Sequence, residues 1–140
     1  MSIRILLADD HLLVRQSLRA LLTKAQDLEI VGEAHDGYDA VKLVESLHPD
    51  LVIMDISMPR LDGIAATKQI VAMENETQVL ILSMHANDAL AKQSLRIGAR
   101  GYLLKRMVSE ELLPAIRHVV EGGIAVSPAL DYSHNSGLSA

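Results

Sequence analysis

The sequence predicts an α/β protein built on a doubly wound parallel sheet. Short apolar runs occur at residues 3–8, 30–34, 51–54, 79–82 and 101–104, and segments with helical periodicity separate them. Continuous apolar runs are typical of strands buried on both faces, and strands that alternate with helices form parallel sheets through right-handed crossovers. In such sheets, ligands bind beyond the carboxyl ends of the strands. We therefore expect the functional residues directly after the strands.

The first three helices follow from apolar residues that recur on one helical face. Residues 30–34 alternate more and include Glu33, which is typical of an edge strand. The Asp62-Gly63 turn precedes the third helix. The residues that define the three helical faces are Val14, Leu18, Leu21, Leu22 and Ala25, then Ala40, Val41, Val44 and Leu47, then Ile64, Thr67 and Ile70.

The last two helices are less regular. Residues 86–97 contain few large apolar side chains, so we expect the fourth helix to bury little and to be weakly held before Gly98 ends it. Ser109 is the expected N-cap of the fifth helix, which Gly122-Gly123 ends. Pro114 should distort the first turn of that helix. Its expected buried face consists of Leu112, Leu113, Ile116, Val119 and Val120.

Composition limits the class of protein. The chain has 140 residues, 49% of them hydrophobic, with a mean hydropathy of +0.21, which predicts one folded domain rather than a disordered chain. A net charge of −5, no Phe or Trp and three Tyr make the chain alone a poor nucleic-acid binder. The absence of cysteine excludes disulfides. No apolar run approaches the ~20 residues of a membrane span, and no signal peptide is visible, so we expect a cytoplasmic protein without membrane contact.

Polar side chains follow four of the predicted strands. Asp9 and Asp10 follow the first strand, Asp55 ends the third, Ser83 the fourth and Lys105 the fifth. A single aspartate after a strand is more often a helix cap, and a single lysine is more often solvated. Together, three carboxylates, a hydroxyl and an ammonium group are what an aspartate needs to accept a phosphoryl group with the help of Mg²⁺. The prediction of a phosphoryl-accepting site therefore rests on the whole ordered set of residues and on no single one of them.

This set resembles the receiver domain of two-component response regulators. The matching segments are Asp9-Asp10, residues 55–63, Ser83 and residues 98–105, and the resemblance covers roughly residues 3–121. The Asp-Asp-His opening and the Gly-Tyr-Leu-Leu-Lys segment are most similar to the NarL/FixJ (LuxR-type) subfamily. The resemblance implies a (βα)5 flavodoxin-like fold, with a five-stranded parallel sheet in the order 2-1-3-4-5 and a receiver domain at residues 1–122.

The resemblance assigns the acidic residues to one site. It makes Asp55 the phosphoryl acceptor and places Asp9 and Asp10 on the magnesium side. The expected Mg²⁺ ligands are Asp10, Asp55 and the backbone carbonyl of Ser57, with Asp9 bound directly or through water. In the metal-free protein, mutual repulsion should raise the pKa of at least one of these carboxyl groups. The six histidines, including His11, show no metal-ligand spacing and are interpreted mostly as surface residues.

The resemblance also assigns the residues that respond to the phosphoryl group. Lys105 and Ser83 would bind its oxygens, and Ser83 and Tyr102 would act as the switch, with Tyr102 turning inward. The face formed by the fourth helix, fifth strand and fifth helix would change as a result. Arg106 stands where many receivers have a proline, often with a cis bond that places the lysine, so the sequence departs from the family pattern directly after Lys105.

The resemblance implies an output beyond this chain. Residues 123–140 are expected to be a linker that leads to an absent C-terminal helix-turn-helix domain, so that DNA is bound only through that domain. The expected partner is a sensor histidine kinase. The protein would catalyse only its own phosphorylation and slow dephosphorylation. A homodimer is left open, with helices one and five, or the face that changes on phosphorylation, as alternative surfaces.

Other function classes fit less well. A dehalogenase-type phosphohydrolase needs a second aspartate two residues after the nucleophile, where this chain has Ser57. An FMN binder of similar architecture needs a glycine- and hydroxyl-rich loop after the first strand, and Asp9-Asp10 would repel the phosphate there. A phosphorylation-independent interaction module with the same fold is the remaining alternative.

Overall fold

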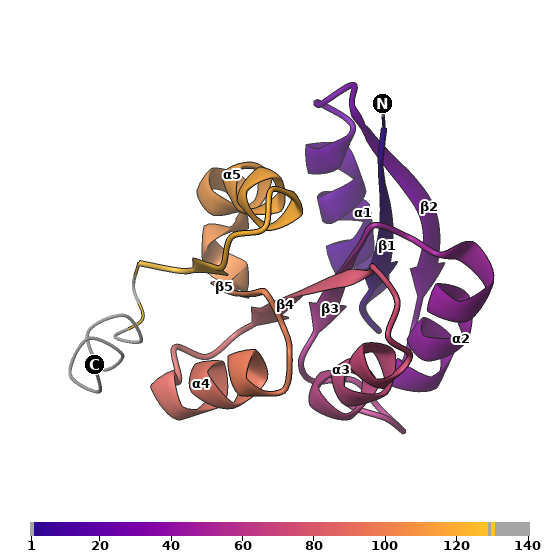
Figure 1. Cartoon of the computed structure of the whole chain (residues 1–140). Helices are drawn as coiled ribbons and strands as arrows, with labels where there is room; N and C mark the ends of the chain where they lie inside the picture. Colours follow the sequence, from indigo (N-terminus) through magenta and orange to yellow (C-terminus); the bar gives the residue numbers. More distant parts are fainter. Residues whose placement is uncertain (1, 129, 131–140) are drawn as a thin grey trace.

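The computed structural model of the chain describes residues 2–128 and 130. A central sheet separates two layers of helices, with α1 and α5 on one face and α2, α3 and α4 on the other (Figure 1). The elements are β1 (Ile3–Ala8), α1 (Leu12–Leu22), β2 (Leu28–Ala34), α2 (Gly37–Leu47), β3 (Leu51–Asp55), α3 (Gly63–Ala72), β4 (Gln78–Ser83), α4 (Asp88–Arg96), β5 (Gly101–Leu104), the 3-10 helix η1 (Lys105–Met107), α5 (Val108–Val120) and β6 (Ala125–Val126).

The sheet is parallel throughout, and its order is β2-β1-β3-β4-β5-β6. The predicted order of the first five strands is confirmed, and β2 lies at an edge as expected. The predicted number of strands is wrong, because Ala125–Val126 adds a sixth strand beside β5. This strand lies in the segment predicted as linker, whose residues 131–140 lie outside the described part of the chain.

The register of the strands aligns their carboxyl ends. Ala8 lies opposite Met54, Asp55 opposite Leu82, and Ser83 opposite Leu104. All five residues of β3 are buried, so the central strand is covered on both faces, as the apolar run predicts. Polar residues that end or follow these strands are therefore brought to one edge of the sheet.

Three helices begin with a side-chain cap. Asp36 accepts a hydrogen bond from the backbone N–H of Asp39 at 2.7 Å, and Asp62 accepts one from Ala65 at 2.8 Å. The cap of α4 is Asn87, so this helix begins later than predicted. Within α4 only Ala91 and Ser94 are buried, which confirms that it buries little. The first helix ends at Leu22, so Ala25 lies beyond it.

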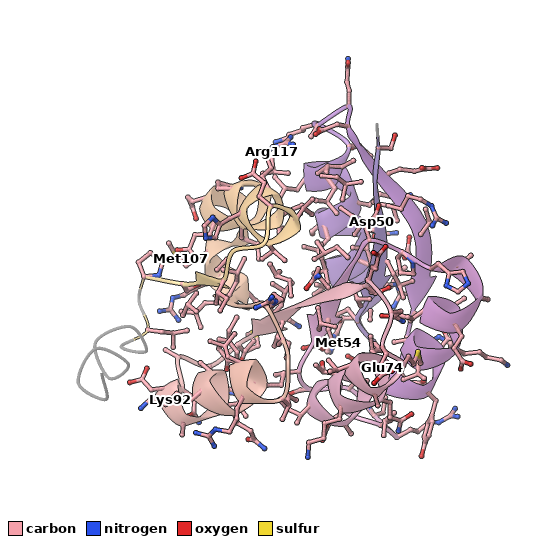
Figure 2. The ribbon with its side chains drawn as sticks, in the orientation of Figure 1. Asp50, Met54, Glu74, Lys92, Met107 and Arg117 are labelled. Atoms are coloured by element: carbon pink, nitrogen blue, oxygen red, sulfur yellow. The ribbon has the colours of Figure 1, made fainter. Side chains whose placement is uncertain are left out.

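The start of α5 differs from the prediction. The chain makes one 3-10 turn at Lys105–Met107 and enters α5 at Val108, with Met107 in the cap position and no side-chain cap. Ser109 is therefore inside the helix, and its predicted role as N-cap is wrong. Val120, predicted on the buried face, is 41% exposed. Arg117, labelled in Figure 2, belongs to α5. Its side chain forms an ion pair with Asp27 in the loop before β2.

None of the helices in the described residues is long and apolar enough to span a membrane.

Candidate functional site

Three charged side chains from three strands meet at the carboxyl edge of the sheet. The Nζ atom of Lys105 lies 3.0 Å from Oδ2 of Asp9 and 3.1 Å from Oδ1 of Asp55. The side chains of Asp9 and Asp55 are 2% and 3% exposed, and that of Lys105 is 12% exposed. The peptide bonds of the described residues are all trans, so Lys105 reaches this position with Arg106 after it and without a cis bond.

The acidic residues form a compact set of oxygen donors. Ligand atoms of Asp9, Asp10, His11 and Asp55 all lie within 4.8 Å of one another. Buried oxygens of Asp10 and Asp55, Oδ1 and Oδ2 respectively, have no hydrogen-bond partner in the described structure. Nδ1 of His11 lies 3.2 Å from that Asp10 oxygen, a charge contact without hydrogen-bond geometry. Unpaired buried carboxylate oxygens are costly, and a hard cation that prefers oxygen ligands would satisfy them. The donor set therefore fits Mg²⁺.

The electrostatics of the site follow from burial. Burial raises the pKa of Asp55 above its usual value, the negative charge of Asp9 raises it further, and Lys105 opposes both effects. Burial alone would lower the pKa of Lys105, but hydrogen bonds and charge attraction from Asp9 and Asp55 outweigh it and raise that pKa. The ammonium group is thus held charged between two carboxylates. Mutual repulsion was the expected cause of a raised carboxyl pKa; at Asp55 burial is the larger cause and repulsion by Asp9 the second.

Local backbone contacts fix the position of Asp55. The backbone N–H of Ser57 lies 3.3 Å from Oδ1 of Asp55, and the N–H of Gly63 donates to the carbonyl of Ile56 at 3.0 Å. A Cβ atom on Gly63 would lie 2.3 Å from the backbone oxygen of Asp55, so only glycine fits there. The Asp62-Gly63 turn, predicted from the sequence as a helix start, also holds the loop after β3 against the site.

Ser83 and Tyr102 are both buried beside this edge. Oγ of Ser83 accepts a hydrogen bond from the N–H of His85 at 3.0 Å, and the hydroxyl of Tyr102 donates to the carbonyl of His85 at 3.2 Å. Tyr102 is fully buried, so in this structure its ring already points inward. The predicted inward turn on phosphorylation stays a prediction. His85 thus links the two predicted switch residues through its backbone, a contact that the sequence did not indicate.

Two residues of the site were missed from the sequence. His11 was interpreted as a surface residue and is 65% exposed at its side chain, yet its N–H and ring both contact Asp9. Arg15 donates from Nη1 to the backbone carbonyl of Asp9 at 2.6 Å and from Nε to Glu33 at 2.9 Å. Side chains in the first turn of a helix point back toward its N-terminus, and this direction could have identified Arg15.

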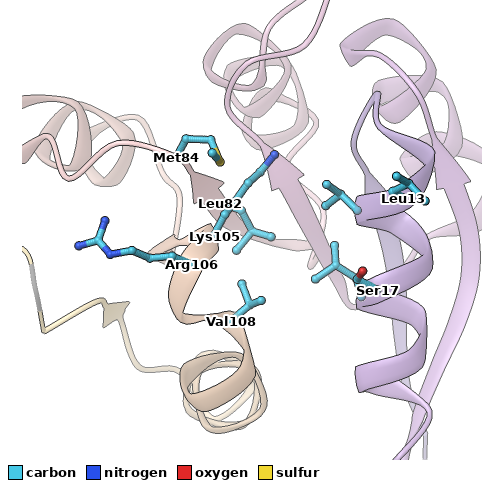
Figure 3. A pocket seen from close by; sticks show the side chains of 9 residues that line it. Leu13, Ser17, Leu82, Met84, Lys105, Arg106 and Val108 are labelled. Carbon is cyan, nitrogen blue, oxygen red and sulfur yellow. The ribbon is translucent and has the colours of Figure 1, made fainter.

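An apolar cavity of about 450 Å³ adjoins Lys105. It lies between α1 and the start of α5, and the side chain of Lys105 runs along one side of it (Figure 3). At this cavity Leu13 and Met84 are 76% and 68% exposed. The acidic site therefore lies next to apolar surface of the kind that protein partners cover.

Comparison with known proteins agrees with this geometry. The family model of the response regulator receiver domain matches residues 5–117. The transcriptional regulatory protein DegU of Brevibacillus brevis is 37% identical over 133 residues, which are 95% of this chain and 56% of DegU. LiaR of Bacillus subtilis is 40% identical over 120 residues, which are 86% of this chain and 57% of LiaR. The chain thus spans little more than half the length of these curated relatives.

Solved structures show the same fold. A LuxR-family two-component response regulator from Aurantimonas superposes with a TM-score of 0.90 at 34% identity, covering 99% of this chain and 98% of that one. The signal receiver domain of NarL from Mycobacterium tuberculosis gives a TM-score of 0.83 at 33% identity, covering 86% and 98%. With the family model matching most of its length, the chain belongs to the response regulator receiver domain family, and its relatives are regulators of the NarL/FixJ type.

Proposed function

We propose that this chain is a phosphorylation-activated signalling switch in which Asp55 accepts a phosphoryl group from a sensor histidine kinase or a small phosphodonor. The observation that supports this most strongly is the contact of Lys105 Nζ with Asp55 at 3.1 Å in a buried acidic site. The second oxygen of Asp55 has no partner, so it is free to act as a nucleophile. We place this activity in the cytoplasm, where response regulators generally work.

The reaction is a phosphoryl transfer to a carboxylate. An oxygen of Asp55 forms a bond to phosphorus while the bond from phosphorus to the donor nitrogen or oxygen breaks, and the donor leaves with the electron pair of that bond. Phosphoryl transfer needs mainly positioning and neutralisation of charge on the equatorial oxygens. Lys105 is a fixed ammonium group beside the acceptor, and Ser83 is a hydroxyl donor on the neighbouring strand. Water later attacks the phosphorus and releases inorganic phosphate.

The acidic residues would hold the divalent cation. Asp9, Asp10, Asp55 and the backbone carbonyl of Ser57 are the proposed ligands, and the unpartnered oxygen of Asp10 and the close spacing of the acidic groups support this assignment. When bound, Mg²⁺ supplies positive charge that offsets the acidic cluster and the phosphoryl oxygens. Two of the similar solved structures carry beryllofluoride in their titles, one of them together with magnesium.

The output would pass through the face of α4, β5 and α5. Ser83 and Tyr102 both contact the backbone of His85, in the loop before α4. A phosphoryl group that displaces Ser83 would therefore also displace the contact of Tyr102 and the start of α4. The small buried surface of α4 makes that helix the easiest to shift. We propose that residues 1–122 form the main body of the receiver, with β6 attached to its sheet, and that the rest of residues 123–140 leads to a helix-turn-helix domain, as the transcription regulators among its relatives suggest.

The apolar cavity beside Lys105 suits the partner kinase. Its exposed Leu13 and Met84 offer a surface that a helical partner could cover while its phosphohistidine faces Asp55. A homodimer of the activated form is a further proposal.

The test is incubation with acetyl phosphate and Mg²⁺, followed by intact mass. We expect an adduct of about 80 Da, the mass of one phosphoryl group. Asp55→Asn should abolish the adduct, omission of Mg²⁺ should suppress it, and Lys105→Ala should slow its formation. Glu45→Gln, an exposed carboxyl group on α2, serves as the control that retains it. A wild-type chain that takes up no phosphoryl group would support the alternative of a phosphorylation-independent interaction module.

A further inference from the structure

The segment after α5 packs back onto the sheet beside the strand that leads to Lys105. Strand β6 pairs with β5, with Val126 opposite Tyr102. Ser127 is 1% exposed, and Leu130 is 6% exposed and belongs to the same apolar cluster as Tyr102. We call residues 125–128 and 130 the docked segment. A passive connector does not bury a serine and a leucine side chain, so this segment is part of the folded domain.

Ser127 makes three hydrogen bonds that join two other elements. Its backbone N–H donates to the carbonyl of Tyr102 at 3.0 Å. Its Oγ accepts from the backbone N–H of Leu104 at 2.9 Å and donates to Oε1 of Glu111 at 2.5 Å. A serine hydroxyl has one proton to donate and lone pairs to accept, so this one side chain connects the end of β5 with α5.

The position of these contacts relates the docked segment to the candidate site. Leu104 directly precedes Lys105, and its buried N–H has Ser127 Oγ as its partner. On its other side, β5 pairs with β4, with Leu104 opposite Ser83. The carboxyl end of β5 is therefore held by β4 on one side and by Ser127 on the other. These contacts lie one residue before Lys105, whose side chain contacts Asp55.

On the basis of the proposed function, we propose that Ser127 is a positioning residue for Lys105 and that docking of its segment is linked to the phosphorylation state of Asp55 through β5. A phosphoryl group that contacts Lys105 and Ser83 changes the forces on the end of β5. Linkage is reciprocal, so the state of the site changes how the docked segment packs, and the packing of the docked segment changes the site. The chain that leaves the receiver is then coupled to the reaction directly, without needing α4.

The first test uses amide NMR signals to follow the end of β5 and Lys105 in the absence of any phosphoryl group. We compare the amide NMR spectra of wild type, Ser127→Ala and Ser109→Ala, the last a control that removes an exposed hydroxyl from α5. Ser127→Ala should shift the amide signals of residues 102–107, and Ser109→Ala should leave them in place. Unchanged signals of Leu104 and Lys105 in Ser127→Ala would overturn the positioning role, whatever the chain does with phosphodonors.

The second test measures whether the state of the site and the packing of the docked segment affect each other. With Mg²⁺ and beryllofluoride, the wild type and Ser109→Ala should show shifted amide signals for Ser127 and Leu130, and Ser127→Ala should lose these shifts. Phosphorylation by acetyl phosphate should be about tenfold slower in Ser127→Ala, because a lysine displaced by a fraction of an ångström loses much of its effect. If Ser127→Ala were phosphorylated at the same rate as the wild type, the proposed coupling would be contradicted.

A second variant covers the case in which Ser127→Ala does not fold. Glu111→Ala removes the acceptor of the Ser127 hydroxyl and leaves the contact with Leu104 possible, so we expect a smaller effect, about threefold, on the phosphorylation rate. A rate and spectrum identical to wild type would overturn the proposal. Absence of any adduct in the wild type would instead refute the proposed function, while the first test would still decide the role of Ser127.

Discussion

Asp55 is a buried carboxylate whose surroundings disfavour its charge. Burial raises its pKa, the charge of Asp9 adds to this effect, and Lys105 compensates only in part. One oxygen of Asp55 has no hydrogen-bond partner. In the proposed function, a cation and a phosphoryl group would relieve this cost, and a site that lowers the stability of the unliganded fold is a common property of functional sites.

This arrangement predicts that Asp55→Asn stabilises the metal-free protein. A carboxyl group with a raised folded-state pKa costs stability wherever it is ionised in both states, and the cost disappears once pH falls below its unfolded-state pKa. Lys105 retains Asp9 as partner in the variant, so no charge is left unpaired. We expect a gain of about 1–2 kcal/mol in EDTA at pH 7. The gain should shrink as pH falls through the folded-state pKa of Asp55.

Thermal melts of the wild type and Asp55→Asn between pH 4 and 7, a range that extends roughly three units above the usual carboxyl pKa of about 4, measure this difference. Glu45→Gln makes the same chemical change at an exposed position and should change stability by less than about 0.5 kcal/mol. A variant that melts below the wild type at neutral pH in EDTA would show that Lys105 more than offsets the burial of Asp55.

The sequence predicted that Asp9, Asp55 and Lys105 would lie close together, and the structure places them so. Asp9, Asp55 and Lys105 each follow or end an apolar run, and the carboxyl ends of parallel strands meet at one edge whatever the details of the loops. The partners of the site were not predictable in this way. His11, Arg15 and the carbonyl of His85 contact it through loop and helix geometry, which periodicity does not encode.

At the next scale, α1 is tied to the edge strand β2 by one carboxylate. Glu33 accepts from Nε of Arg15 at 2.9 Å and also pairs with Arg19 one turn later. Arg15 in turn contacts the backbone of Asp9. The hydrogen bond from Arg19 lowers the pKa of Glu33 most, and the hydrogen bond from Arg15 and the positive charges of both arginines lower it further. Burial of Glu33 raises its pKa but is outweighed. This ion-pair network connects the outer strand to the acidic site.

The network predicts a pH-dependent contribution from Glu33. Its folded-state pKa lies below the unfolded value, so its stabilisation is present above the unfolded-state pKa and is lost as pH falls through the folded-state pKa. The side chain of Glu33 is 28% exposed and solvent screens the pairs, so we expect Glu33→Gln to cost only about 0.5–1 kcal/mol at pH 7. Urea unfolding at pH 7 and pH 3 checks this, with Glu29→Gln on the same strand as control.

The loss in Glu33→Gln should be smaller at the acidic pH, because unfolded Glu33 is then largely protonated and the stabilisation declines as pH falls toward the lowered folded-state pKa. Equal losses at both pH values would mean that the side chain acts by packing rather than by its charge.

Two elements show where sequence patterns stop being informative. Ser109 has the right chemistry for an N-cap, but the 3-10 turn at Lys105–Met107 starts the helix earlier, and Met107 occupies the cap position instead. Strand β6 has only two residues, between glycines and a proline, and too few for any periodicity. It forms because β5 offers an unpaired edge, which is a property of the assembled sheet.

For the whole molecule, the consequence is that the folded domain extends beyond the end of α5. Strand β6 covers the edge of β5, so Tyr102 pairs with strands on both sides, and the backbone N–H of Leu104 donates to the hydroxyl of Ser127. An uncovered strand edge exposes N–H and C=O groups that can pair with another chain. The sheet as a unit therefore depends on residues that the sequence assigns to a linker.

This extension predicts that a chain ending at residue 122 is less stable than one ending at residue 130. The shorter chain leaves the buried N–H of Leu104 without a partner and exposes the apolar surface that Leu130 covers, while the loss of ordered residues returns some entropy. We expect a net loss of about 2 kcal/mol in urea unfolding. We also expect concentration-dependent self-association by sedimentation, because the edge of β5 becomes open. Identical unfolding midpoints and a monomer at all concentrations would show that β6 rests on the sheet without stabilising it.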